Sequence, residues 1–530
     1  MIKRKKKFIL LTVIIIIIIL KINNTSFVYN ENKNENEYGV SSSNDIAVEV
    51  GMNIMESGGN AIDAAIAISY VLGVVEPYAS GIGGGGGMLV YSKDDNIAQF
   101  YDYREYAPKN TKDSTRYIGI PGFVKGMEYI HNIYGNLDME QVLNPAIYYA
   151  EQGFTLNKFL YNRFEFSKNK LSKYKLPQFY KEGQTLEVGS KIVQKDLART
   201  LKIIQQEGAD VFYEGIIGEK LIEFTGWNEE DLNYKVERKN PIKSNFMEYE
   251  ITTAPPPFSG ISFAQILKLA QYADLKDYES DKLDYIKKMS KIMNVVYEDR
   301  LKNIGDPNFI SKEYDYMVDD RYVKNMLNKN YNKNYNINEE ENEHESTTHF
   351  VVIDKDGMVV SCTNTLSDFF GSGEYIEGFF LNNALSNFNY TNEKSINTYQ
   401  IGKKPRTFMS PTIIKKENEF IMGIGSPGGN RIPQVMSQVT LNNLVFNHDL
   451  QESINNDRLI FKDLYNITSE KKINEKDKKI LNEEGYKIYI NESKLYYGAI
   501  QALVKNNDGK VFGGADYRRN GSWDKDNVDT

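Results

Sequence analysis

One helix of this chain is apolar on nearly every side, and such a helix has no face that it can turn towards water. Residues 61–75 read AIDAAIAISYVLGVV and follow Asn60. Asn60 is a favourable N-cap, and Asp63 places negative charge in the first turn, where the helix dipole favours it. A helix that is hydrophobic all round belongs in the interior of a large protein. We therefore predict a buried helix over 61–75.

A glycine-rich segment, SGIGGGGGMLVYS at 80–92, comes shortly after this helix. It contains the spacing Gly-x-Gly-x-x-Gly of dinucleotide-binding loops. In those folds the glycines follow a strand and open a helix, whereas here they follow a helix and open a strand. No Lys-Ser/Thr pair completes a phosphate-binding loop either. We reject nucleotide binding and expect tight backbone packing that only glycine allows.

Charge and rare residue types exclude several functions. The chain has 64 Lys+Arg against 72 Asp+Glu, a net charge of -8, so it has no general attraction for nucleic acid. An acidic substrate would need a local cationic pocket. The single cysteine, Cys362, rules out an internal disulfide. The four histidines are not at metal-ligand spacing, and we predict neither a metal nor an organic cofactor.

The N-terminus reads MIKRKKKFILLTVIIIIIILKINN, a basic cluster followed by an apolar run at 8–20. This run is short for a bilayer span of about 20 residues but suits the hydrophobic region of an export signal. A buried core helix is a poor alternative because the isoleucine run has no polar face. No small-x-small cleavage site follows, so we predict that 1–22 is a signal-anchor or an atypically cleaved signal. The rest of the protein is expected outside the membrane, at the cell surface of a bacterium.

A polar, charged and low-complexity stretch at 325–345, NMLNKNYNKNYNINEEENEHE, precedes Ser346. Such a composition cannot form a core, and we predict a solvated linker. The next residues, TTHFVVIDKDGMVVSCTNT at 347–365, divide into two β-rich runs joined by a turn. If Lys355 to Gly357 form the loop, Thr347 lies opposite Thr365 on one face of a hairpin. A register shift of one residue would break this pairing.

Two threonines at the end of a hairpin have two interpretations. Thr–Thr pairing is common in sheets and requires no function. Alternatively, cleavage before Thr347 would expose an α-amine beside the hydroxyl of the same residue, so that one residue supplies both nucleophile and base. The unperturbed pKa of such an amine, near 8, suits it to accept the hydroxyl proton at neutral pH. Thr365 would then orient the Thr347 oxygen.

Seven stretches together resemble the γ-glutamyltranspeptidase family of N-terminal nucleophile hydrolases, in the order of that family. They are GGNAIDAAIAISYVLGVVEPYASGIGGGGGMLVY, DYREYAP, GIPGFVKGMEYIHNIYG, TTHFVVIDKDGMVVSCTNT, FFLNNALSNF, FMSPT and GSPGGNRI. The resemblance implies an α+β fold, a four-layer αββα sandwich. It also implies a precursor that cuts itself between Ser346 and Thr347. A large fragment, 44–346, with the linker 325–346 at its end, would stay together with a small catalytic fragment, 347–530, as a heterodimer.

The resemblance also implies roles for other residues. Gly428 and Gly429 of GSPGG look like the backbone donors of an oxyanion hole, although by themselves they indicate only a turn. One such donor is typically worth about 3 kcal/mol of the barrier. Arg104 of DYRE looks like the residue that holds the α-carboxylate of the substrate. Taken alone, an arginine beside a glutamate is more often a surface ion pair.

Departures from the family pattern concern the donor substrate. Glutathione-type members hold a free α-ammonium with an acid and consecutive serines, whereas this chain has Asn387 and Thr407-Phe408 at the matching positions. Ser367 and Ala384 replace larger polar amides. An internal residue of a γ-linked glutamate polymer has no free ammonium, and an asparagine can bond its amide without charge. A short segment before FMSPT suggests an open groove, which basic residues would line: Lys403, Lys404, Arg406, Arg518 and Arg519.

These features favour the capsule-processing branch of the family. We expect an exported acyltransferase or hydrolase that acts on poly-γ-glutamate through a γ-glutamyl ester on Thr347. An amine acceptor, such as one on peptidoglycan, would attach the polymer, and water would shorten it. One alternative is a transpeptidase or hydrolase of glutathione-like small donors. Another is a non-catalytic surface protein that binds anionic polymer. The sequence leaves open the acceptor, the stereochemistry of the polymer and the higher assembly.

Overall fold

The computed structural model describes residues 37–93, 95–110, 117–171, 176–328, 346–506 and 508–526. The predicted signal at 1–22 lies outside these ranges, as do residues 329–345 of the predicted linker. Residues 325–328 are not linker but the end of a helix, α12 (Asp320–Asn328). In the part of the chain that the structure describes, no helix combines the length and apolar character needed to cross a membrane.

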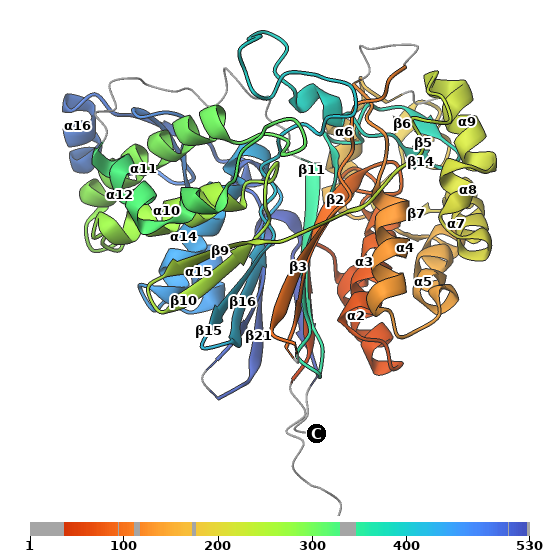
Figure 1. Ribbon diagram of the computed structural model, residues 1–530, viewed down its shortest axis with the longest axis horizontal. Coiled ribbons are helices and arrows are strands. Elements are labelled where there is room, and N and C mark those ends of the chain that lie inside the picture. The colour runs from red at the N-terminus through yellow and green to blue at the C-terminus, as the bar shows by residue number, and fades with distance from the viewer. Residues whose placement is uncertain are drawn as a thin grey trace, which may run out of the picture. The chain divides into compact units, whose positions relative to one another are not determined.

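Two antiparallel sheets pack face to face at the centre of this part (Figure 1). In strand order, the first contains β22 (Ser522–Lys525), β1 (Gly39–Ser42), β11 (Ser346–Ile353), β12 (Val359–Ser367), β2 (Gly85–Ser92), β3 (Ile97–Asp102) and β8 (Glu237–Lys239). The second contains β21 (Val511–Ala515), β20 (Gln501–Lys505), β16 (Glu419–Gly425), β15 (Thr412–Lys416), β10 (Tyr249–Thr253) and β9 (Ile242–Phe246). Leu89, Phe100, Val351, Ile413 and Leu503 belong to the apolar core between them.

Helices cover the outer face of each sheet (Figure 1). On the side of the first sheet lie α2 (Asp45–Glu56), α3 (Ala61–Val75), α4 (Phe123–Tyr134), α5 (Met139–Gln152), α6 (Lys158–Phe166), α7 (Lys195–Glu207), α8 (Asp210–Tyr213) and α9 (Ile216–Thr225). On the other side lie α10 (Gly260–Tyr272), α11 (Lys282–Asn303), α12, α14 (Ile432–Leu444), α15 (Leu450–Asn455) and α16 (Glu475–Glu483). The predicted four-layer αββα architecture is confirmed.

The predicted apolar helix, α3, is buried along its whole length except for the partly exposed Gly73. Asn60 and Asp63 form a capping box, in which each side chain accepts a hydrogen bond from the backbone of the other residue. The helix packs directly on β11 and β12. Its apolar surface therefore supports the hairpin that carries the two threonines.

Short elements complete the fold. They are β4 (Phe154–Thr155), β5 (Tyr180–Lys181), β6 (Gln184–Thr185), β7 (Lys191–Ile192), β13 (Tyr375–Ile376), β14 (Phe379–Phe380), β17 (Leu459–Phe461), β18 (Asn466–Ser469) and β19 (Lys487–Ile490), with 3-10 turns η3 (Asp315–Val318), η4 (Ala384–Asn387), η5 (Gly429–Arg431), η6 (Lys494–Tyr497) and η7 (Tyr517–Arg519).

Both sheets contain strands from before and after the predicted cut. In the first sheet β1, β2, β3 and β8 come from the earlier segment, and β11, β12 and β22 from the later one. In the second sheet β9 and β10 come from the earlier segment and form one edge, where β10 pairs with β15 of the later segment. Neither segment can form a complete sheet alone, so fragments produced by a cut at Thr347 would stay joined. The position of that cut stays a prediction.

The glycine-rich segment packs against neighbouring backbone, as expected. A Cβ on Gly83 would lie 2.1 Å from the Phe380 carbonyl oxygen, and one on Gly84 would lie 2.2 Å from the carbonyl oxygen of Thr365. Gly85 pairs with Thr365 in the sheet, and a Cβ there would lie 2.5 Å from the Tyr103 oxygen. Such distances are far inside van der Waals contact. The glycines allow β2 to lie against the chain around Thr365.

We expect Gly84→Ala to lower the free energy of unfolding by about 3 kcal/mol or more, because the new methyl group meets rigid backbone rather than a movable side chain. Gly58→Ala is the matched control: its Cβ would meet nothing within 4 Å, and only its φ of +93° opposes alanine. We expect that variant to lose about 1 kcal/mol. Urea unfolding followed by circular dichroism measures both, and equal losses would contradict the steric explanation.

Candidate active site

The hairpin of β11 and β12 has the predicted register. Thr348 pairs with Asn364, Ile353 pairs with Val359, and the Gly357 N–H donates to the Asp354 carbonyl oxygen at 3.0 Å. A bulge interrupts the ladder between Ser346 and Thr348, so Thr347 does not occupy a regular pair. Its Oγ1 nevertheless lies 3.3 Å from the Oγ1 of Thr365. The predicted proximity of the two hydroxyl groups is therefore confirmed.

The carbonyl oxygen of Ser346 accepts hydrogen bonds from both threonine hydroxyls. The Thr347 Oγ1 and the Thr365 Oγ1 each donate to it at 2.7 Å. All three residues are buried, with Thr347 the most exposed at 7%. The hydroxyl of Thr347 thus lies beside the peptide bond that precedes it, and the hydroxyl of Thr365 is aimed at the oxygen that would become negative during an attack.

This arrangement suits cleavage of the bond between Ser346 and Thr347. Attack of the Thr347 Oγ1 on the Ser346 carbonyl carbon forms a C–O bond and breaks the C–N bond, and the hydroxyl proton passes to the Thr347 nitrogen. The product is an ester beside a free α-amine. Water can then hydrolyse the ester. Simple pairing of two threonines would not require both hydroxyls to share one peptide carbonyl.

Gly428 and Gly429 follow β16, which packs against β11. Their φ angles are +134° and +58°, in the region that favours glycine, and they lead through η5 into α14. Gly425, at the end of β16, lies so close to His349 that a Cβ there would be 2.3 Å from the imidazole ring. The two glycines therefore lead into a helix next to β11, the strand that contains Thr347. Their role as oxyanion donors stays a prediction.

Arg104 lies two residues after the end of β3 and is 1% exposed. Its Nε lies 3.0 Å from the Glu105 carboxylate, and both side chains are buried, so this is not a surface ion pair. Burial raises the pKa of Glu105, although Arg104 opposes the rise. Among the described residues the Arg104 Nη2 has no hydrogen-bond partner. A buried guanidinium with a free donor can bind a carboxylate. The Arg104 backbone lies beside Gly85, which pairs with Thr365: a Cβ on Gly85 would be 3.2 Å from the Arg104 Cα. The role of Arg104 in holding the substrate stays a prediction.

Asn387 lies at the end of η4, close to the hairpin. Its Nδ2 donates to the Ala384 carbonyl oxygen at 3.1 Å and to the Ser367 Oγ at 3.4 Å. Ser367 pairs with Ser346 across the sheet. The structure thus places Asn387 beside the predicted cleavage site. Its role in substrate binding stays a prediction.

Thr407 is held mainly through its backbone. Its carbonyl oxygen accepts from Ser259 Oγ at 2.8 Å and from Arg300 Nη2 at 3.2 Å. Its Oγ1 accepts from the Met409 N–H at 3.3 Å. These contacts stabilise a local turn, and the predicted contact of Thr407 with substrate stays a prediction.

The prediction that basic residues line an open groove is wrong. Arg406 is 2% exposed, and its Nη1 donates to the Arg300, Leu301 and Ile304 carbonyl oxygens, where it caps the C-terminus of α11. The others are also buried: Lys403, Lys404, Arg518 and Arg519. Lys404 pairs with the Asp102 carboxylate at 3.0 Å, and Arg518 pairs with that of Glu470 at 2.6 Å. Their partners are distant in the sequence, so sequence alone could not distinguish buried cations from exposed ones.

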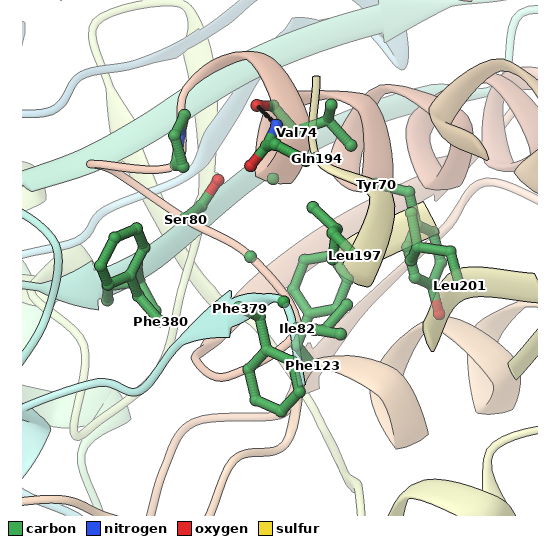
Figure 2. A pocket seen from close by; sticks show the side chains of 15 residues that line it. Tyr70, Val74, Ser80, Ile82, Phe123, Gln194, Leu197, Leu201, Phe379 and Phe380 are labelled. Carbon is green, nitrogen blue, oxygen red and sulfur yellow. Dashed lines mark hydrogen bonds between the residues drawn. The ribbon is translucent and has the colours of Figure 1, made fainter. Parts of the chain in front are cut away.

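A small cavity lies between α3, α7 and the turn before β2 (Figure 2). Its volume is about 10 Å³, room for about one water molecule. Its walls are mostly apolar: Tyr70, Ile82, Phe123, Leu197, Leu201 and Phe379. It is too small for a γ-glutamyl group, so we do not assign it to the substrate.

Sequence reasoning missed a buried carboxyl group near the hairpin. Glu76 follows α3 and is 4% exposed, and its Oε2 accepts from the Ser43 Oγ at 2.9 Å. The only signal in the sequence was an acid at the end of an apolar helix. Among the described residues, no group of three or more His, Cys, Asp or Glu side chains is arranged to hold a metal ion.

Comparisons with known proteins agree with this geometry. The family described as gamma-glutamyltranspeptidase matches residues 47–524. The capsule biosynthesis protein CapD proenzyme of Bacillus anthracis is 46% identical over 92% of this chain and 90% of that protein. The glutathione hydrolase proenzyme of Escherichia coli strain K12 is 31% identical over 89% of each chain. A crystal structure of cephalosporin acylase from Bacillus halodurans matches the fold with a TM-score of 0.82 at 24% identity, covering 94% of this chain and 98% of that one.

We expect Thr365→Val to slow cleavage before Thr347 by about 100-fold, because valine keeps the shape of threonine but removes one donor from the Ser346 oxygen. Thr365→Ser is the matched control, since it keeps a hydroxyl group, and we expect it to cleave within about 10-fold of the wild-type rate. The intact mass of freshly purified precursor, followed over time, measures the rate. Cleavage of Thr365→Val at the wild-type rate would contradict the assigned role.

Proposed function

Because the chain belongs to the γ-glutamyltranspeptidase family, we propose that it is a self-cleaving γ-glutamyl acyltransferase and hydrolase whose donor is poly-γ-glutamate. The observation that carries the proposal is the Ser346 carbonyl oxygen, which accepts from the hydroxyls of Thr347 and Thr365. After cleavage, the same Thr347 oxygen would be free for a substrate carbonyl.

The reaction would proceed in two steps. The Thr347 Oγ1 attacks the γ-carbonyl carbon of the donor, with its proton taken up by the new α-amine, whose ordinary pKa lies near 8. The donor C–N bond breaks, the released amine takes the proton, and a γ-glutamyl ester remains on Thr347. An acceptor amine or water then attacks the ester and regenerates the hydroxyl. Backbone donors at Gly428 and Gly429 would stabilise the oxyanion in both steps.

Asn387 favours a polymer over a small donor. A carboxylate at this position would attract the free α-ammonium of a small donor, but an internal residue of poly-γ-glutamate has an amide nitrogen there instead. The 46% identity to the Bacillus anthracis capsule biosynthesis protein, against 31% to the Escherichia coli glutathione hydrolase, supports the same choice. Arg104 would hold the α-carboxylate of the residue under attack.

The acceptor and the cellular location are further parts of this proposal. Transfer to an amine of peptidoglycan would attach the polymer to the cell wall, and transfer to water would shorten it. The basic and apolar N-terminus supports an exported enzyme held at the membrane. The two fragments would act as one heterodimer, because each sheet contains strands from both of them.

Self-cleavage is the first expectation to test. We expect the chain without residues 1–22 to yield a fragment that begins at Thr347, while Thr347→Ala stays whole because it has no nucleophile. N-terminal sequencing and intact mass distinguish the two. An uncut wild-type protein would contradict the enzymatic proposal and favour the alternative of a polymer-binding surface protein.

Donor choice is tested by giving the cleaved protein poly-γ-glutamate with an amino acceptor, and in parallel a chromogenic γ-glutamyl anilide. We expect shorter or amide-linked polymer, detected by chromatography and mass spectrometry, and little anilide turnover. Asn387→Asp should raise anilide turnover by about 10-fold or more, because a carboxylate can bond the free ammonium. Fast anilide turnover by the wild type without action on polymer would favour the glutathione-type alternative.

A further inference from the structure

A buried chain of hydrogen bonds connects Glu76 to the strand of the nucleophile. We call Glu76, Ser43 and Thr348 the Glu76 network. The Ser43 Oγ donates to the Glu76 Oε2 at 2.9 Å and lies 3.0 Å from the Thr348 Oγ1. The Ser43 hydroxyl donates its one proton to Glu76, so in the contact between Ser43 and Thr348 the Thr348 hydroxyl is the donor. All three side chains are at most 4% exposed.

This network holds one side of the bond that is expected to break, and a neighbouring contact holds the other side. Thr348 directly follows Thr347, and its hydroxyl is bound to Ser43. Ser346 directly precedes Thr347, and its Oγ donates to the Tyr78 carbonyl oxygen, two residues beyond Glu76. Both neighbours of the nucleophile are therefore fixed to the same buried region after α3. Once Ser346 has left, Thr348 is the side-chain anchor that remains on the new N-terminus.

We propose that Glu76 is a positioning residue for self-cleavage: through Ser43 it holds the Thr348 hydroxyl and so fixes the backbone that presents Thr347 to the Ser346 carbonyl. The inference rests on the self-cleavage proposed above. Thr347 lies at a bulge, where the regular ladder does not fix its position. Side-chain anchors on both neighbours supply the constraint that the ladder lacks, and small displacements of reacting atoms slow a reaction strongly.

The surroundings of Glu76 are arranged to donate to a carboxylate. Besides Ser43, the side chains of Asn44 and Tyr78 form hydrogen bonds with it, and the positive charge of Arg519 is close. The positive charge of Arg163, on α6, also acts on Tyr78. Burial nevertheless raises the pKa of Glu76 to about 7, and these hydrogen bonds and Arg519 oppose the rise. Glu76 therefore changes charge near neutral pH, although it is far from solvent.

Protonation would rearrange the network. A protonated carboxyl group must donate one hydrogen bond, so at least one of its present donors has to turn and accept. If Ser43 turns, it donates to Thr348 instead, and Thr348 loses its acceptor. When Glu76 is ionised, it can only accept, so Ser43 donates to Glu76 and Thr348 donates to Ser43. We infer that this state supports cleavage.

The test compares the pH dependence of self-cleavage in wild type and in Glu76→Gln. The uncut precursor has no α-amine at Thr347, so the amine pKa does not contribute to this profile. We expect the wild-type rate to rise with pH through about 7, the pKa of Glu76. Glu76→Gln keeps an acceptor for Ser43 but has no charge to lose, and we expect its rate to lack this rise. The same profile in both proteins would overturn the proposal.

Variants of the other two members test the connection. We expect Ser43→Ala and Thr348→Val to slow cleavage by about 10- to 100-fold, and Thr348→Ser to restore most of the rate. Adding Glu76→Gln to Ser43→Ala should change nothing further, because Glu76 then no longer reaches Thr348. Ser42→Ala is the matched control: Ser42 is a buried neighbour whose Oγ has no partner among the described residues. If Ser43→Ala and Thr348→Val cleave like Ser42→Ala, the proposal is wrong, even if Glu76→Gln does not fold.

Stability gives a second readout that needs no cleavage. Since the folded state raises the pKa of Glu76 from 4.5 to about 7, folding is favoured by the bound proton below pH 4.5, and this contribution is lost as the pH rises to about 7. In the uncleaved Thr347→Ala background, we expect the free energy of unfolding to fall over this range relative to the same chain carrying Glu76→Gln. If the free energy of unfolding depends on pH in the same way with and without Glu76→Gln, the raised pKa of Glu76 is contradicted. Absence of cleavage in wild type would instead overturn the proposed function and this inference together.

Discussion

The close approach of Gly84, Gly85 and Gly86, at the start of β2, to β12 is the contact on which the site depends. A Cβ on Gly84 would lie 2.2 Å from the Thr365 carbonyl oxygen, and one on Gly86 would lie 2.4 Å from that of Thr363. No larger residue fits between these backbones. β2 and α3 therefore both pack on β12, the strand that carries Thr365. Thr365 in turn donates to the carbonyl group that Thr347 would attack.

Thr347, the proposed nucleophile, lies at the irregular position of the otherwise regular ladder between β11 and β12. The bulge between Ser346 and Thr348 frees the Thr347 backbone from pairing. Cleavage before Thr347 would also require that the two fragments stay together afterwards. The sheets satisfy this requirement, because each sheet contains strands from both sides of the cut. The start of β11 must also keep its position, and the Glu76 network holds it through Thr348.

Buried charges hold the surrounding chain segments rather than forming a cationic groove. Lys404 and Lys239 share the Asp102 carboxylate, and the N–H of Arg104 donates to the same carboxylate at 2.9 Å. The two lysines hold the pKa of Asp102 well below its usual range, in spite of its burial. This cluster positions the backbone of Arg104. The Arg104 Nη2 has no hydrogen-bond partner among the described residues, and its predicted contact with a substrate carboxylate stays a prediction.

Local patterns in the sequence determined the features whose causes are local. The helix at 61–75 follows from a run of apolar residues that leaves no polar face. The close packing of the glycine-rich segment follows from its missing side chains, and the register of the hairpin follows from its turn. Motif order identified the family and the four-layer fold. Only the tertiary structure decided which charged residues are buried and with which residues they pair, because those partners are distant in the sequence. Glu76, for example, is bound to Ser43, which in turn contacts Thr348, 305 positions further along the chain. The same holds for Arg406, whose sequence context suggests a solvated loop and whose side chain caps a buried helix end. Charge and polarity are properties of a residue, but its solvation is a property of the fold.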